Sequence, residues 1–111
     1  MNKHFKLSDF AVTYSTRTKA DEIAACLKTY IKTVNNDDTL VIDFSGVEAI
    51  SYSFLDQFIS DICQLSVMKE KRLSLAGWSD SILPVIDKSL QHRSCNYSKS
   101  VNDERILVSL Q

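Results

Sequence analysis

The sequence contains only two glycines and one proline among 111 residues. A glycine-rich loop that cradles a bound phosphate needs several glycines close together, so the composition gives a nucleotide-binding fold little support. The chain also lacks a surplus of either charge, because its formal net charge is -1 at pH 7. Without a basic patch there is no electrostatic footprint for nucleic acid, and we expect no nucleic-acid partner.

Cysteine is scarce as well. The three residues, Cys26, Cys63 and Cys95, lie far apart and include no C-x-x-C pair. An odd count at such spacings indicates neither a disulfide framework nor a zinc site, so we expect no metal or other cofactor. Two of the cysteines fall within amphipathic segments, where we expect small residues that are buried or half-buried.

No apolar run approaches the roughly 20 residues that a membrane-spanning helix needs, and we expect no membrane partner. The first ten residues, MNKHFKLSDF, lack the apolar core of a signal peptide. These two absences predict a cytoplasmic protein. A length of 111 residues and a hydrophobic content of 44% predict a single globular domain spanning residues 1–111.

Segments rich in β-forming residues alternate along the chain with segments whose apolar residues recur at helical spacing. Strands are expected at 4–7, 10–14, 39–44, 72–78 and 96–101, and helices from about 18, 51–53, 81 and 102. Alternating strands and helices imply crossover connections. We therefore predict an α/β fold with a single mostly parallel or mixed sheet of four to five strands and about four helices.

Three helix starts are predicted from residue types. Thr18 has the position of an N-cap, Ser53 with Asp56 has the form of a capping box, and Ser81 precedes the third helix. Pro84 would lie in the first turn of that helix, where a missing N–H costs little. Shared periodicity predicts a core made by Leu40, Ile42 and Phe44 with Ile23, Leu27, Phe58 and Ile62.

The C-terminal segment 102–111 fits two structures. Ile106, Val108 and Leu110 alternate as in a strand. Asn102 could instead cap a helix, since two acidic residues follow it and the apolar residues also fit helical spacing. We favour the terminal helix.

The stretch DFSGVEAISYSFLDQF, residues 43–58, runs from a strand through a turn and three hydroxyl residues into a helix. Asp43 ends the apolar strand, and a carboxylate there can accept hydrogen bonds from backbone N–H groups of the following turn. Because this segment joins a buried strand to a helix, we expect Ser51 and Tyr52 to be at least partly exposed.

The longer segment LVIDFSGVEAISYSFLDQF, residues 40–58, resembles the central motif of STAS domains, the fold of bacterial anti-sigma-factor antagonists. That motif is an apolar strand, an Asp, a turn containing Ser or Gly, and then Asp-Ser-Ser-Gly-Leu leading into a helix. The SYSFLDQF version is similar to a STAS-like family of unknown function in which Phe replaces the Gly. The resemblance implies a STAS-like α/β fold over most of the chain.

The resemblance also indicates which residue of this sequence corresponds to the regulatory position of the family. In the antagonists, phosphorylation of the first Ser of Asp-Ser-Ser is the switch, and that Ser corresponds to Tyr52 here. The preceding Asp corresponds to Ser51, the second Ser to Ser53 and the Gly to Phe54. The usual acceptor is therefore absent, and Ser51 and Ser53 remain as phosphorylation candidates one residue away.

The function that the resemblance implies is a non-catalytic, regulatory protein-interaction module. Its partner would be a protein such as a histidine-kinase-like ATPase, bound through the loop 45–54 and the helix after it. The expected partner-binding residues are Ser51, Tyr52, Ser53 and Phe54.

Two other classes stay open as alternatives, a small Ser- or Cys-dependent hydrolase and a nucleotide-binding domain. The hydrolase is disfavoured because the chain has no G-x-S-x-G elbow. A nucleophile also needs a base within hydrogen-bond reach, and neither His4 nor His92 has an evident link to Ser51 or Ser53.

Overall fold

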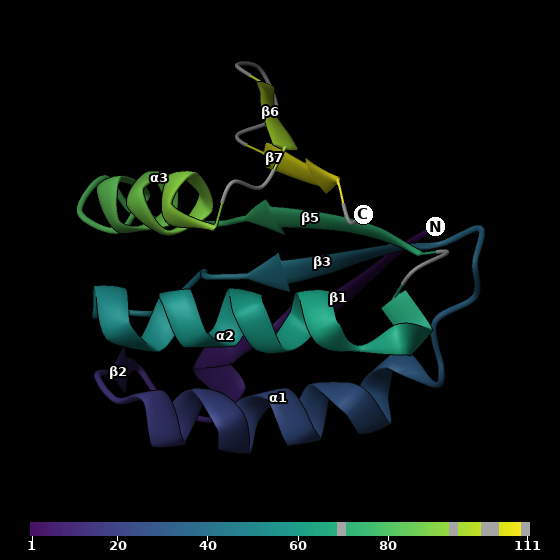
Figure 1. Cartoon of the computed structure of the whole chain (residues 1–111), viewed down its shortest axis with the longest axis horizontal. Helices are drawn as coiled ribbons and strands as arrows, with labels where there is room; N and C mark the ends of the chain where they lie inside the picture. Colours follow the sequence, from purple (N-terminus) through teal and green to yellow (C-terminus); the bar gives the residue numbers. More distant parts are fainter. Residues whose placement is uncertain (69–70, 94–95, 101–104, 110–111) are drawn as a thin grey trace.

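The structure, a computed structural model, describes residues 1–68, 71–93, 96–100 and 105–109. Its centre is a five-stranded mixed sheet with the strand order β1-β3-β5-β7-β6 (Figure 1). The strands are β1 (Asn2–Lys6), β3 (Thr39–Asp43), β5 (Arg72–Ala76), β6 (Asn96–Ser100) and β7 (Arg105–Ser109). Strands β1, β3 and β5 are parallel, whereas β7 runs antiparallel to both β5 and β6.

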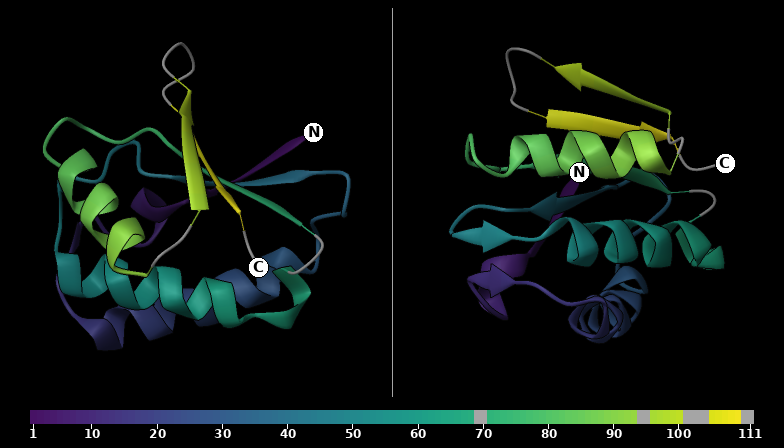
Figure 2. Two further views of the ribbon diagram at one scale, coloured as in Figure 1. Left: turned by 45° about the horizontal axis from the view of Figure 1, so that its top comes forward. Right: turned by 60° about the vertical axis from the view of Figure 1, so that its left-hand side comes forward.

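Three α-helices pack against this sheet. They are α1 (Arg17–Ile31), α2 (Tyr52–Gln64) and α3 (Leu83–His92). Helix α2 lies between α1 and α3, and α1 and α2 lie on one side of the sheet (Figures 1 and 2). No helix in the described part of the chain is long and apolar enough to cross a membrane.

Shorter elements connect the main ones. Strand β2 (Thr13–Tyr14) pairs in parallel with β4 (Ala49–Ile50) outside the main sheet. Two short 3-10 helices, η1 (Leu7–Asp9) and η2 (Ser66–Met68), follow β1 and α2. The described structure is therefore an α/β fold with a mixed five-stranded sheet and three α-helices, consistent with a STAS-like fold.

The core lies between the sheet and helices α1 and α2. Phe5, Ile42, Leu75 and Ile106 occupy matching positions on four adjacent strands, and all four are buried. In β3 the three central residues are fully buried, as its short β-branched run predicted. All seven predicted core residues are buried: Leu40, Ile42, Phe44, Ile23, Leu27, Phe58 and Ile62.

The C-terminal helix prediction is wrong. Residues Arg105–Ser109 form strand β7, in which Val108 pairs with Leu73 and Ile106 pairs with Leu75. Ile106 and Val108 are buried while Leu107 is 52% exposed, so the two-residue alternation matches a half-buried strand. Asn102, the predicted cap, lies outside the described residues.

Two predicted helix caps are displaced. Helix α1 is capped by Thr16, whose hydroxyl accepts a hydrogen bond from the Lys19 N–H at 3.1 Å, and Thr18 is an exposed residue inside the helix. Helix α3 begins after Ile82 without a side-chain cap, so Ser81 does not have its predicted role. The proline does lie in the first turn of α3, as predicted.

The burial prediction for the cysteines is wrong. Cys26 on α1 and Cys63 on α2 are both exposed. Each is next to a buried core residue in sequence, and one position along a helix turns a side chain by about 100°, which is enough to leave the buried face. Cys95 lies outside the described residues.

Candidate functional site

The turn after β3 is held by the carboxylate at the end of that strand. Asp43 Oδ1 accepts a hydrogen bond from the Ser45 N–H at 2.9 Å, as its position predicted. Gly46 has a φ of +83°, a conformation that side chains rarely adopt. A Cβ added at Gly77 would collide with the Asp43 carboxylate and the Ser45 side chain, so glycine is required there as well. The loop is therefore fixed at the carboxyl end of the sheet.

The two-stranded ribbon of β2 and β4 holds the second half of the loop. The Ser51 N–H donates to the Tyr14 carbonyl oxygen at 2.8 Å, immediately after the pairing of Ile50 with Tyr14. The Tyr14 hydroxyl donates to the Leu7 carbonyl oxygen at 2.6 Å. These bonds tie the start of α2 to the segment that leads into α1.

The N-cap of α2 is Ser51, and the predicted capping box of Ser53 with Asp56 does not form. The Ser51 hydroxyl accepts from the Phe54 N–H and donates to the Ser15 carbonyl oxygen, both at 3.0 Å. The hydroxyl therefore uses its only donor, and one of its two acceptor positions, to hold the start of α2. Ser53 lies one residue inside the helix and is exposed.

Phe54 was predicted as a partner-binding residue, but the structure places it in the core. Its side chain is 0% exposed. The ring lies 4.5 Å from the ring of Tyr14 and 5.5 Å from that of Phe58, measured between centroids. Phe54 therefore cannot contact a partner on the folded surface, and only the three residues before it reach solvent.

Tyr52, the first residue of α2, is half-buried and lies against α3. The Lys88 ammonium group is 4.5 Å from the centre of its ring, a cation–π distance. The His92 ring meets it edge-on with centroids 5.9 Å apart. The partial exposure predicted for Ser51 and Tyr52 is confirmed.

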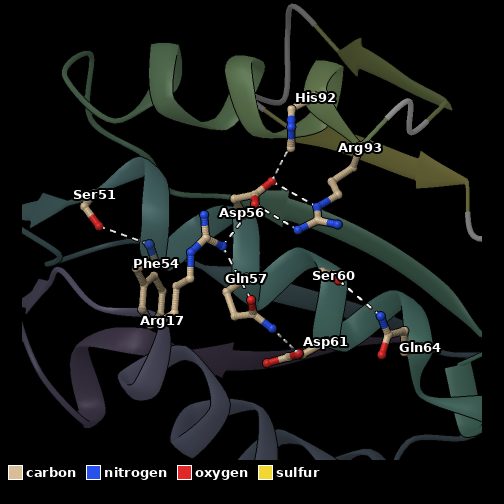
Figure 3. Close-up of polar contacts among 10 residues, drawn as sticks. All are labelled: Arg17, Ser51, Phe54, Asp56, Gln57, Ser60, Asp61, Gln64, His92 and Arg93. Carbon is tan, nitrogen blue, oxygen red and sulfur yellow. Dashed lines mark hydrogen bonds and ion pairs between the residues drawn. The ribbon is translucent and has the colours of Figure 1, made fainter.

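One turn further along α2, a buried carboxylate joins the three helices (Figure 3). Asp56, 1% exposed, accepts hydrogen bonds from Arg93 at 2.9 and 3.0 Å, from His92 at 3.0 Å and from Arg17 at 3.1 Å. Arg17 begins α1, whereas His92 and Arg93 end α3. We call Arg17, Asp56, His92 and Arg93 the Asp56 cluster.

These hydrogen-bond partners stabilise the ionised form of Asp56. Burial alone would raise the pKa of its carboxyl group, but the hydrogen bonds from Arg93, His92 and Arg17 outweigh it and lower the pKa to about 2. The carboxylate is therefore ionised at neutral pH and fixes the side chains of Arg17, His92 and Arg93. A carboxylate–imidazole pair could also orient a general base, but no hydroxyl of the described residues hydrogen-bonds to His92.

The region that contains this loop and the Asp56 residue also matches the model of a protein family. Residues 21–65 match the model of a family described as a STAS-like domain of unknown function (DUF4325). The chain carries a STAS-like segment. Neither the search of curated proteins nor the search of solved structures found a significant match. The STAS-like segment runs from α1 to the C-cap of α2 and includes the loop 45–54, Tyr52 and Asp56.

The STAS-like segment contains a second polar feature, a groove of about 390 Å³ between α1 and α2. Asp21 and Asp61 both line it, beside Lys28 and Gln64. Asp61 Oδ1 accepts from the Gln57 side chain at 2.9 Å, whereas its buried Oδ2 has no hydrogen-bond donor among the described residues. Burial, and then the neighbouring Asp21, raise the pKa of Asp61 to about 6.

Replacing Asp61 with Asn should stabilise the protein at pH 7. Because the pKa of Asp61 is about 6 when folded and about 3.8 when unfolded, the folded state binds this proton more tightly. The stability that the protonated Asp61 carboxyl contributes is complete below pH 3.8 and disappears as the pH rises through 6. After allowance for solvent screening, we expect Asp61→Asn to gain about 1–2 kcal/mol at pH 7.

Urea unfolding of both proteins at pH 4 and pH 7 measures this effect. The amide keeps the oxygen that accepts from Gln57, so the hydrogen bond at 2.9 Å can persist. The two proteins should differ more at pH 7 than at pH 4. If the variant is less stable than the parent at pH 7, the ionised Asp61 carboxylate does not destabilise the folded protein.

Proposed function

We propose that the protein is a non-catalytic regulatory module that binds a partner protein through the exposed part of the loop 45–54 and the first turn of α2. The observation that carries this proposal is a partly exposed aromatic residue, Tyr52, at the start of α2 in a STAS-like segment. A STAS-like domain suggests a regulatory, protein-binding role. The partner class that the resemblance implies is a histidine-kinase-like ATPase.

Tyr52 has the properties of an interface anchor. Tyrosine supplies a large contact area with few rotatable bonds, and it is enriched among residues that dominate binding energy. The ring is already oriented by Lys88 and His92, so little conformational freedom would be lost on binding. The Asp56 cluster fixes His92 in turn.

The two phosphorylation candidates differ in their surroundings. A phosphate on Ser51 would break the hydrogen bonds to Phe54 and Ser15 that cap α2. Ser53 is exposed on the first turn of α2, where a phosphate would lie near the positive end of the helix dipole. We therefore propose Ser53 as the better acceptor of the two if a serine kinase acts on this module.

Tyr52→Ala should weaken partner binding by at least about tenfold, the effect of removing a modest interface anchor. The partner would first be obtained by affinity capture with the parent protein and identified, and its affinity for each variant would then be measured by calorimetry. We expect the free energy of unfolding to change by no more than about 1 kcal/mol, because the ring is only half-buried.

Tyr52→Phe is the matched control. It keeps the ring and its contacts with Lys88 and His92 but removes the hydroxyl, so it should bind nearly as tightly as the parent. If Tyr52→Ala binds as tightly as the parent, the interface lies elsewhere. Turnover of ester or phosphate substrates by the fully purified protein would favour the hydrolase alternative over a binding module.

A further inference from the structure

We propose that the surface around Tyr52 binds an acidic segment of the partner, a stretch of chain that presents Asp or Glu carboxylates. This inference rests on the proposed function, because it assigns a chemistry to the same surface. The surface consists of Tyr52 with Arg17, Lys88, His92 and Arg93, which we call the cationic surface.

The balance of charge on the cationic surface is positive. Arg17 and Arg93 share one carboxylate, Asp56, and a third permanently charged side chain, Lys88, contacts the ring of Tyr52. Asp56 is buried, so its carboxylate is not accessible to a ligand, whereas the side chains that bind it reach the surface. The chain as a whole has a net charge of -1, which makes a local excess of positive charge a distinct feature of this end of the helices.

Helices α2 and α3 position most of the groups on this surface. Tyr52 and Asp56 are four residues apart on α2, and Lys88 and His92 are four residues apart on α3, so each pair lies on one helix face. The two faces meet in the contacts of Tyr52 with Lys88 and of Asp56 with His92. A ligand would find these groups already placed.

Donor groups on this surface remain accessible to a ligand. The Arg17 side chain is 48% exposed and the His92 side chain is 58% exposed. Arg17 uses only Nη1 in its hydrogen bonds to Asp56 and Gln57, and a guanidinium carries five N–H donors. Lys88 is exposed and contacts the Tyr52 ring. Carboxylates are the natural acceptors for these donors.

Two other acidic side chains lie in the neighbouring groove. Asp21 and Asp61 line the groove between α1 and α2, and Asp61 interacts electrostatically with Arg93 from there. Arg93 therefore interacts with two carboxylates, Asp56 and Asp61, so Arg17 and Lys88 are the cations expected to attract a ligand. A peptide suits the site better than a nucleic acid, since the cations form one compact cluster instead of a long basic stripe.

A hexaglutamate peptide is a direct probe. Titrated into ¹⁵N-labelled protein at low salt, it should shift the amide resonances of Tyr52, Ser53, Lys88 and His92, whereas hexalysine should not. Lys88→Glu should weaken peptide binding at least about fivefold, because it reverses one charge of the surface. Raising the ionic strength from about 0.05 M to 0.3 M should weaken it several-fold as well.

Lys32→Glu is the matched control. Lys32 is also exposed but lies at the far end of α1 from Arg17, about 22 Å away at 1.5 Å per residue. It should change the affinity by less than about twofold, since a charge at that distance is screened by salt. Equal losses for the two lysine variants, or shifts spread over the whole surface, would overturn the proposal. So would tighter binding of oligothymidylate than of hexaglutamate.

The outcomes separate this inference from the proposed function. If Tyr52→Ala loses the captured partner but hexaglutamate does not bind, the partner surface is right and its acidic chemistry is wrong. If Tyr52→Ala keeps the partner while hexaglutamate binds at the cationic surface, the surface recognises acidic groups but is not the partner interface.

Discussion

Replacing Phe54 with alanine is expected to lower the free energy of unfolding by about 3–5 kcal/mol. The ring is fully buried and packs between the rings of Tyr14 and Phe58. Its removal loses the transfer free energy of the aromatic side chain and leaves a cavity where β2 meets α2. Urea unfolding followed by far-UV circular dichroism measures the loss.

Ser53→Ala provides the control for Phe54→Ala. Ser53 is the preceding residue on the same helical turn, but it is exposed and does not cap the helix. Its replacement should change stability by no more than about 0.5 kcal/mol. If Phe54→Ala costs less than 1 kcal/mol, the ring is not part of the core, and the sequence-based prediction of a surface contact would regain support.

Asp56→Ala is the second change with a large expected effect, about 2–3 kcal/mol of stability, because several charge-assisted hydrogen bonds are lost together. The loss stays below the full cost of breaking a buried ion pair, since Arg17 and His92 are about half exposed and can be rehydrated. Loss of the carboxylate should also release His92 from its fixed position against Tyr52.

The pH dependence of the Asp56 contribution has a defined sign. The pKa of Asp56 is about 2 when folded and about 3.8 when unfolded, so the folded state releases this proton more readily. Its stabilisation is complete above pH 3.8 and is lost as the pH falls through 2. Asp56→Asn should therefore be less stable than the parent at pH 5, and the difference should shrink towards pH 2. A difference that is constant over this range would contradict the assigned ionisation.

Much of the fold was predictable because its signals are local. The run of apolar residues in β3 and the helical spacing in α1 and α2 each lie within a few residues of sequence. The role of Asp43 also follows from a contact only two residues away. The family resemblance was carried by this same stretch, and the matched segment 21–65 contains it.

The features that were missed depend on contacts between distant residues. Asp56 meets Arg17 across 39 positions and Arg93 across 37, so its local setting suggested only a capping role. The one available signal was an acidic residue within the apolar face of α2, where an unpaired charge would be costly. Strand β7 was missed for a similar reason, because pairing with β5 decided between two patterns that the segment fits equally well.

The placement of Ser51 shows how close competing positions can be. Ser51 and Ser53 are both suitable N-cap residues, and the sequence alone favoured Ser53 because of Asp56. The extended backbone of Ser51 and its hydrogen bond to the Tyr14 carbonyl oxygen, next to the β2–β4 ribbon, fix the helix start two residues earlier. That shift moves Phe54 into the core and leaves Tyr52 as the aromatic side chain at the surface.

Hydrogen–deuterium exchange of the protein with and without its captured partner tests the central claim most directly. We predict protection in peptides covering residues 45–56 and 83–93, which contain the loop, the first turn of α2 and helix α3. A second exposed aromatic, Phe10 at 44% exposure, borders a groove of about 410 Å³ between β1 and α1. Protection confined to residues 3–12 and 26–33 would place the partner in that groove and contradict the account.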